Sequence, residues 1–128
     1  MPTLADRLAT VLAEVLTVDA EPDGALTVRQ DGLLASLRVV PIAEDLELVS
    51  LTAILAWDLP LTEHLRTRVA EQADLSQLGT VSLVGKDASA DVILRYNFPG
   101  SGLSDGALRT LVLMVLAKGV DIRDALTA

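Results

Sequence analysis

Histidine, the side chain best suited to acid–base chemistry at neutral pH, occurs once in this chain, as His64. Cysteine is absent, so the chain has no thiolate nucleophile, disulfide or thiolate metal site. No serine lies in the Gly-x-Ser-x-Gly turn that exposes a hydrolase nucleophile. His64 lies in the first turn of an expected helix and is most simply a solvated surface residue. The sequence therefore predicts no nucleophilic active site, and we interpret the chain as non-enzymatic.

The segment Asp19–Gly24 imitates the beginning of a calcium-binding loop. An EF-hand loop needs alternating oxygen ligands, glycine at its sixth position and a bidentate glutamate at its twelfth. Counted from Asp19, the sixth residue is Gly24, but the twelfth is Gln30, whose amide cannot act as a bidentate carboxylate. A hairpin also follows where the EF-hand needs a helix. We read the segment as a solvated connector and predict no metal site.

A glycine-rich turn, Gly100–Gly102, precedes another expected helix. Free N–H groups at a helix N-terminus favour anions. No lysine completes a Walker pattern, however, and the glycine spacing is not that of a dinucleotide-binding fingerprint. Asp105 adds a negative charge in the first turn of the helix. The turn is interpreted as a strand-to-helix connection, and no cofactor is predicted.

The balance of charge argues against nucleic-acid binding. The chain has 18 acidic and 10 basic residues and a net charge of −8. Because phosphate neutralisation supplies most nucleic-acid affinity, this domain starts with the wrong sign. Apolar residues make up 51% of the chain but aromatic residues only 2%, so aliphatic side chains must fill the core. Apolar surface in excess of one small core usually forms an interface, and we expect a homodimer.

Nothing in the sequence predicts a membrane partner. No uninterrupted apolar stretch reaches the roughly 18 residues of a membrane span. Asp6, Arg7 and Glu14 interrupt the first apolar residues, which is untypical of a signal peptide. The absence of cysteine fits a reducing compartment, so we expect a cytoplasmic protein.

Three segments have the apolar spacing of helices. The clearest covers residues 3–18, and a second covers 62–75. The third covers 104–118, with Gly119 expected as a left-handed C-cap before a short helical turn at 121–126.

The third helix is apolar around most of its circumference, which predicts burial on more than one side. Leu111, Val112, Val115 and Leu116 form one face. Leu113 and Met114 extend the apolar surface beyond that face, and they are the candidate dimer interface.

The dipeptide Asp31-Gly32 predicts a hairpin. A two-residue type I′ turn favours this pair because both central residues need a positive φ. Folding the chain there gives the pairs Gln30–Leu33, Val28–Ala35 and Leu26–Leu37 on one face, and Arg29–Leu34 and Thr27–Ser36 on the other. Turn chemistry and alternation therefore predict a single register.

The longest expected strand, at about 46–58, is apolar on both faces. Its odd positions carry Val49, Leu51, Leu55 and Trp57, and its even positions carry Leu46, Leu48 and Ile54. Such a strand is central in the sheet, or its second face meets a partner. With further strands at 80–84 and 90–98, we expect an α+β fold with the order α-βββ-α-ββ-α. Its sheet is five-stranded and mostly antiparallel, in one domain over residues 1–128.

The C-terminal half resembles a known family. Gly79–Val84, Asp91–Pro99 and Gly102–Val112 are similar to the glycine-opened strand, the apolar strand ending near proline and the final helix of the YbjN-like and type III secretion chaperone-like (CesT-type) group. The resemblance covers about 79–116 in residues and most of the chain in element order. It implies the secretion chaperone-like fold, and a small acidic cytosolic dimer that holds extended client segments or acts as a regulator.

We therefore expect a non-catalytic domain that binds peptides or proteins. Its candidate partner-binding residues are Leu34, Leu48 and Ile54, which alternate outward beside polar neighbours. If the second helix covered them, they would be core instead. The acidic charge would suit partners with basic and apolar stretches. The alternatives are a structural or regulatory subunit of a larger complex and, third, an enzyme that uses scattered carboxylates.

Overall fold

The computed structural model describes residues 2–127 of the chain. Over these residues the elements follow in the order α1 (Leu4–Ala13), β1 (Thr17–Ala20), β2 (Leu26–Gln30), β3 (Leu33–Ala43), β4 (Leu46–Pro60), α2 (Glu63–Leu75), β5 (Thr80–Lys86), β6 (Ser89–Pro99) and α3 (Asp105–Thr127). The strands form one antiparallel sheet in the order β1-β2-β3-β4-β6-β5. This confirms the α+β class, but the sheet has six strands instead of the expected five.

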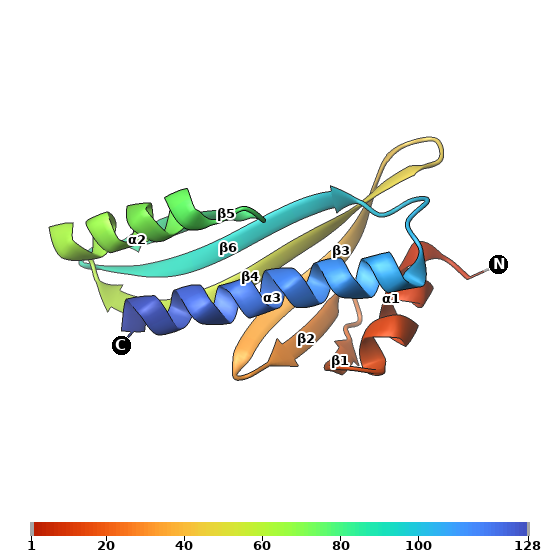
Figure 1. Ribbon diagram of the computed structural model, residues 1–128, viewed down its shortest axis with the longest axis horizontal. Coiled ribbons are helices and arrows are strands. Elements are labelled where there is room, and N and C mark those ends of the chain that lie inside the picture. Colours follow the sequence, from red (N-terminus) through yellow and green to blue (C-terminus); the bar gives the residue numbers. More distant parts are fainter. Residues whose placement is uncertain (1, 128) are drawn as a thin grey trace.

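All three helices pack on one face of the sheet (Figure 1). α3 crosses the middle strands, α1 lies at the β1 end, and α2 lies beside β5 at the other end. Buried side chains of the three helices and of the inward-facing strand positions form a single apolar core, in which Leu12, Leu51, Leu94 and Leu116 are fully enclosed. Among the described residues, no helix covers the opposite face.

The predicted hairpin is confirmed residue by residue. Leu26 pairs with Leu37, Val28 with Ala35 and Gln30 with Leu33. The two turn residues, Asp31 and Gly32, have φ angles of 51° and 81°. Both are left-handed, as a type I′ turn requires.

The first helix is shorter than predicted, and the last residues of its predicted range begin the additional strand, β1. α1 ends at Ala13, and Thr17–Ala20 pairs with β2, with Val18 opposite Val28. Val15 and Leu16 continue the apolar spacing of the helix, but they lie in the turn between α1 and β1. β-branched Thr17 and Val18 favour the strand, and the exposed edge of β2 supplies the hydrogen-bonding partner.

The predicted end of the last helix is wrong. α3 continues through Gly119 to Thr127 without a break. Gly119 is buried, and a Cβ atom there would lie 3.0 Å from Leu33 Cδ2 and 3.3 Å from Leu55 Cδ2. The glycine therefore allows the helix to approach the sheet closely, and it does not act as a cap.

The predicted face of Trp57 is also wrong. The register between β4 and β6 shifts between Ile54 and Ala56 and again between Ala56 and Leu59. Leu55 and Ala56 are both buried as a result, although they are neighbours in sequence. A β-bulge of this kind reverses the alternation that follows it, and Trp57 is 58% exposed.

Candidate functional site

No helix of residues 2–127 covers the other side of the sheet, and we call this side the open face. It is formed by side chains that alternate away from the core on β2 to β6. Its central members are Thr27, Arg29, Leu34, Ser36, Arg38, Val40, Leu48, Ser50, Thr52, Ile54, Ser82, Ile93, Arg95 and Asn97.

One end of the open face is hollowed. Leu34 on β3 lies directly opposite Ile54 on β4, and the indole of Trp57 lies beside them. Together with Thr27, Ser36 and Thr52 they line a depression of about 180 Å³, which we call the hollow. Its walls are almost entirely apolar, because the serine and threonine residues contribute little polar surface to the lining. Such a surface can accept one large apolar side chain of a partner.

The three candidate partner-binding residues lie on the same face but not at the same place. Leu34 and Ile54 are cross-strand neighbours in the hollow. Leu48 pairs with Val40 and lies beside Pro99, six residues along β4 from Ile54. At about 3.4 Å per residue this separation is about 20 Å. α2 packs on the opposite face and does not cover any of the three.

Polar residues separate these two apolar ends. The pairs Ser36–Thr52 and Arg38–Ser50 cross the middle of the open face between β3 and β4. On β6, Arg95 lies opposite Thr52 and Asn97 lies opposite Ser50. The open face is therefore two apolar patches joined by a hydrogen-bonding belt.

Within residues 2–127, each cation of the open face except Arg95 has a carboxylate beside it. Arg29 lies 3.9 Å from the carboxylate of Asp19, and Arg38 donates to Asp23, where it holds the pKa of that carboxyl below its usual range. Lys86 contacts two carboxylates, as described next. Arg95 is exposed and forms no hydrogen bond or ion pair through its side chain with residues 2–127.

A small ion cluster fixes the backbone beside Trp57. Asp58 has a left-handed φ of 49°, and its N–H donates to Oδ1 of Asp91 at 2.9 Å. The ammonium of Lys86 lies 3.0 Å from Asp91 and 3.1 Å from Asp58. The Asp58 N–H and then Lys86 hold the pKa of Asp91 below its usual range, and these carboxylates raise the pKa of Lys86. We assign this cluster a positioning role, because all its groups are satisfied by one another.

Three of the 18 acidic residues lie in hairpin turns. Asp31, Asp45 and Asp87 each occupy a hairpin turn with a positive φ. Aspartate tolerates this conformation better than most residues, because its short side chain hydrogen-bonds locally. The central members of the open face include no acidic side chain, so the net charge of −8 does not by itself determine the sign of charge of a partner of this face.

The candidate dimer residues lie on the helical side. Leu113 is half-buried, and Met114 is 53% exposed. Met114 lines a second depression, of about 360 Å³, with Leu75, Gln77, Leu78 and Lys118. Leu75 is 64% exposed, so α3 and the end of α2 together present an apolar patch.

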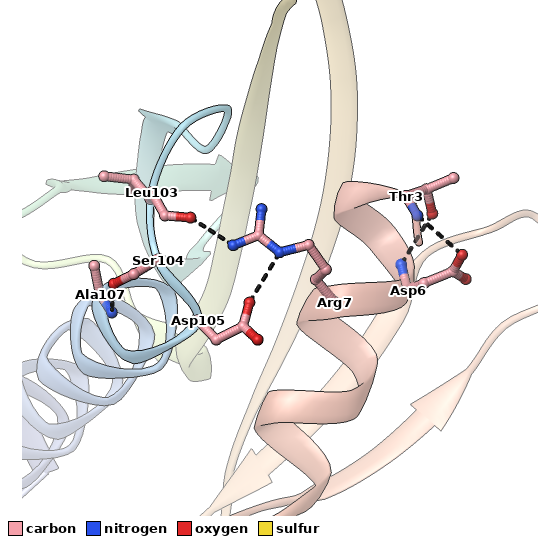
Figure 2. Close-up of polar contacts among 7 residues, drawn as sticks. All are labelled: Thr3, Asp6, Arg7, Leu103, Ser104, Asp105 and Ala107. Atoms are coloured by element: carbon pink, nitrogen blue, oxygen red, sulfur yellow. Dashed lines mark hydrogen bonds and ion pairs between the residues drawn. The ribbon is translucent and has the colours of Figure 1, made fainter. Parts of the chain in front are cut away.

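The glycine-rich turn before α3 has a structural role. The hydroxyl of Ser101 accepts a hydrogen bond from the N–H of Glu47 at 2.8 Å, and Gly100 packs against Leu4. Figure 2 shows that the N-terminus of α3 is occupied by residues of the chain itself. Asp105 binds the guanidinium of Arg7 at 2.9 Å, and Arg7 also donates to the carbonyl of Leu103.

The remaining sequence motifs are dispersed. In the calcium-like segment, Asp19 points toward Arg29 and Asp23 binds Arg38. His64 is exposed on α2. Among residues 2–127, no group of three or more His, Cys, Asp or Glu side chains is arranged to hold a metal ion.

Sequence comparison adds no assignment: no family model matches the chain, and no curated protein matches it. No helix of the described residues is long and apolar enough to cross a membrane. Leu34 and Ile54 were predicted from the sequence to share this surface, but Trp57 and Arg95 were not. The bulge in β4 moves Trp57 to the face opposite the one that simple alternation predicts. The position of Arg95 follows only from the pairing of β6 with β4.

Proposed function

We propose that this chain is a non-catalytic protein-binding domain, which holds an extended segment of a partner protein on the open face. The observation that carries the proposal is the hollow formed by Leu34, Ile54 and Trp57 on a sheet face that no described helix covers. Apolar side chains at such a position are costly to leave in water and favour a partner. The neighbouring serine and threonine hydroxyls can satisfy the polar backbone of an extended segment.

The resemblance to the YbjN-like and CesT-type group supports the same proposal. The order of helices and strands is compatible with a secretion chaperone-like fold, apart from the additional strand β1. We further propose that the chain acts in the cytoplasm as a homodimer. The exposed apolar patch of Leu75 and Met114 supports the dimer, because apolar side chains are costly to leave in water. A dimer formed through this patch would leave the open face free for a partner.

A peptide library panned against the purified protein tests the binding function. We expect extended apolar segments to be selected, and their binding to be lost in Leu34→Ser. Val15→Ser is a matched control, because Val15 is 47% exposed but lies between α1 and β1, away from the open face. Both variants should retain stability within about 1 kcal/mol. If no segment is selected, or if both variants bind equally well, the open face is not the binding site.

The alternative, a structural or regulatory subunit of a larger complex, predicts a different composition of native assemblies. Native mass spectrometry of the protein from its source cell should give several substoichiometric partners if it holds clients. One constant partner at fixed stoichiometry would favour the subunit.

A further inference from the structure

Arg95 lies at the rim of the hollow. It is directly opposite Thr52, which lines the hollow, and two residues along β6 from Ile93, which is opposite Ile54. Diagonal neighbours of this kind lie about 7–8 Å apart across a sheet. A peptide whose apolar side chain occupies the hollow could therefore reach Arg95 with a side chain one or two residues away.

The surroundings of Arg95 on the open face are uncharged. Its cross-strand neighbours are Thr52 on β4 and Thr80 on β5, and Ile93 and Asn97 flank it along β6. Every other cation of this face already has a carboxylate beside it: Arg29 has Asp19, Arg38 has Asp23, and Lys86 has Asp58 and Asp91. A carboxylate of a partner would therefore be attracted more strongly to Arg95 than to any other cation of this face.

In an extended peptide, residues i and i+2 point to the same side and are separated by about 6.5–7 Å. This spacing matches the offset between the hollow and Arg95. We infer that the segment held on the open face is acidic, with a large apolar side chain in the hollow and a carboxylate two residues away that binds Arg95. The inference rests on the proposed protein-binding function and reverses the charge expected from the whole sequence.

The chain has one tryptophan, and it lines the hollow, so Trp57 fluorescence reports occupancy directly. We would titrate the full-length protein with three peptides that lack tryptophan and tyrosine and share the pattern Leu-Thr-X, where X is Glu, Gln or Lys. The Glu peptide should bind best and the Lys peptide worst, with a difference between Glu and Gln of up to about fivefold in Kd at low salt. Added salt should reduce that difference.

Two variants isolate the role of the guanidinium. Arg95→Gln should give equal affinity for the Glu and Gln peptides and should keep the circular dichroism of the native protein. Arg29→Gln removes a cation of the same face that is already paired, and it should keep the preference for Glu. Decanoate, an apolar chain with a carboxylate but no peptide backbone, serves as a further probe.

The outcomes separate this inference from the proposed function. Tighter binding of the Lys peptide, or an unchanged preference for Glu in Arg95→Gln, overturns the acidic assignment while peptide binding still stands. Preference for decanoate over all three peptides overturns the peptide assignment. If no peptide binds by fluorescence or calorimetry, the protein-binding function itself fails. A blue shift of Trp57 emission with protein concentration alone would show that a second copy covers the hollow, which also overturns the inference.

Discussion

Asp91 accepts a hydrogen bond from the backbone N–H of Asp58 at 2.9 Å, and this bond ties the bulged end of β4 to β6. Asp58 directly follows Trp57, so the bond fixes the backbone that carries the indole. Lys86 reaches both carboxylates from β5. The orientation of the hollow's largest side chain therefore depends on ionised groups outside the hollow.

The stabilisation from Asp91 should depend on pH. Its pKa is lower in the folded protein than the value of about 3.9 for an unperturbed aspartate. The stabilisation is therefore complete above the unfolded pKa and is lost as the pH falls through the folded pKa. We expect Asp91→Asn to lower the melting temperature at pH 7 and to differ less from the wild type below about pH 4. Asp19→Asn, in the exposed 3.9 Å pair with Arg29, is the control and should have little effect at either pH.

Gly119 should resist enlargement. A side chain there would meet Leu33 and Leu55 at 3.0 and 3.3 Å, so Gly119→Val must separate α3 from the sheet or displace both leucines. We expect a loss of about 1–3 kcal/mol in the free energy of unfolding, measured by urea denaturation. Gly106→Val, in the same helix but without a close neighbour, should change stability by less than about 0.5 kcal/mol. Equal effects at both glycines would contradict the close approach.

The hairpin turn provides a backbone test. Gly32 has a φ of 81°, a conformation that is an outlier for a β-branched residue. Gly32→Val should therefore cost about 1–3 kcal/mol in unfolding free energy. Gly85→Val, at a glycine without a left-handed φ and with only a distant contact to Leu61, is the control. A neutral Gly32→Val variant would mean that the turn is not of this type.

Self-association should depend on Met114. We expect a dimer at micromolar concentration by light scattering, against a chain mass of 13.5 kDa. Met114→Glu places a charge in the exposed apolar patch and should weaken the dimer at least about tenfold in Kd. Thr110→Glu, at another exposed position of α3, should leave it intact. A wild-type protein that stays monomeric at high concentration would contradict the dimer, and a dimer in Met114→Glu would move the interface elsewhere.

What the sequence predicted well is local. The Asp31-Gly32 turn and the alternation on either side of it determine the register of β2 and β3 without help from distant residues. The identity of β1, the role of Gly119 and the face of Trp57 depend on contacts that are remote in sequence. Val18 becomes a strand residue because β2 offers an edge, and Gly119 is needed because Leu33 and Leu55 lie beneath it. For the same reason, Arg95 could be placed beside the hollow only once β6 was paired with β4.

The separation of Leu48 from the hollow leads to a prediction about client length. Ile54→Asp introduces a carboxylate between Leu34 and Trp57 and should abolish binding of every peptide that uses the hollow, whatever its length. Leu48 lies about 20 Å from Ile54, so a short peptide anchored in the hollow should bind the Leu48→Asp variant as tightly as it binds the wild type. A longer peptide that reaches the patch of Val40 and Leu48 should bind Leu48→Asp more weakly.

Leu48 and Ile54 are both half-buried on the open face, so Leu48→Asp and Ile54→Asp should remain folded, which circular dichroism can verify. The comparison of short and long peptides against the two variants then distinguishes one anchoring point from a continuous strip. If Leu48→Asp weakens short and long peptides equally, Leu48 acts through the fold and not as a contact. If it weakens neither, the client does not reach the patch of Val40 and Leu48, and the binding surface ends before that patch.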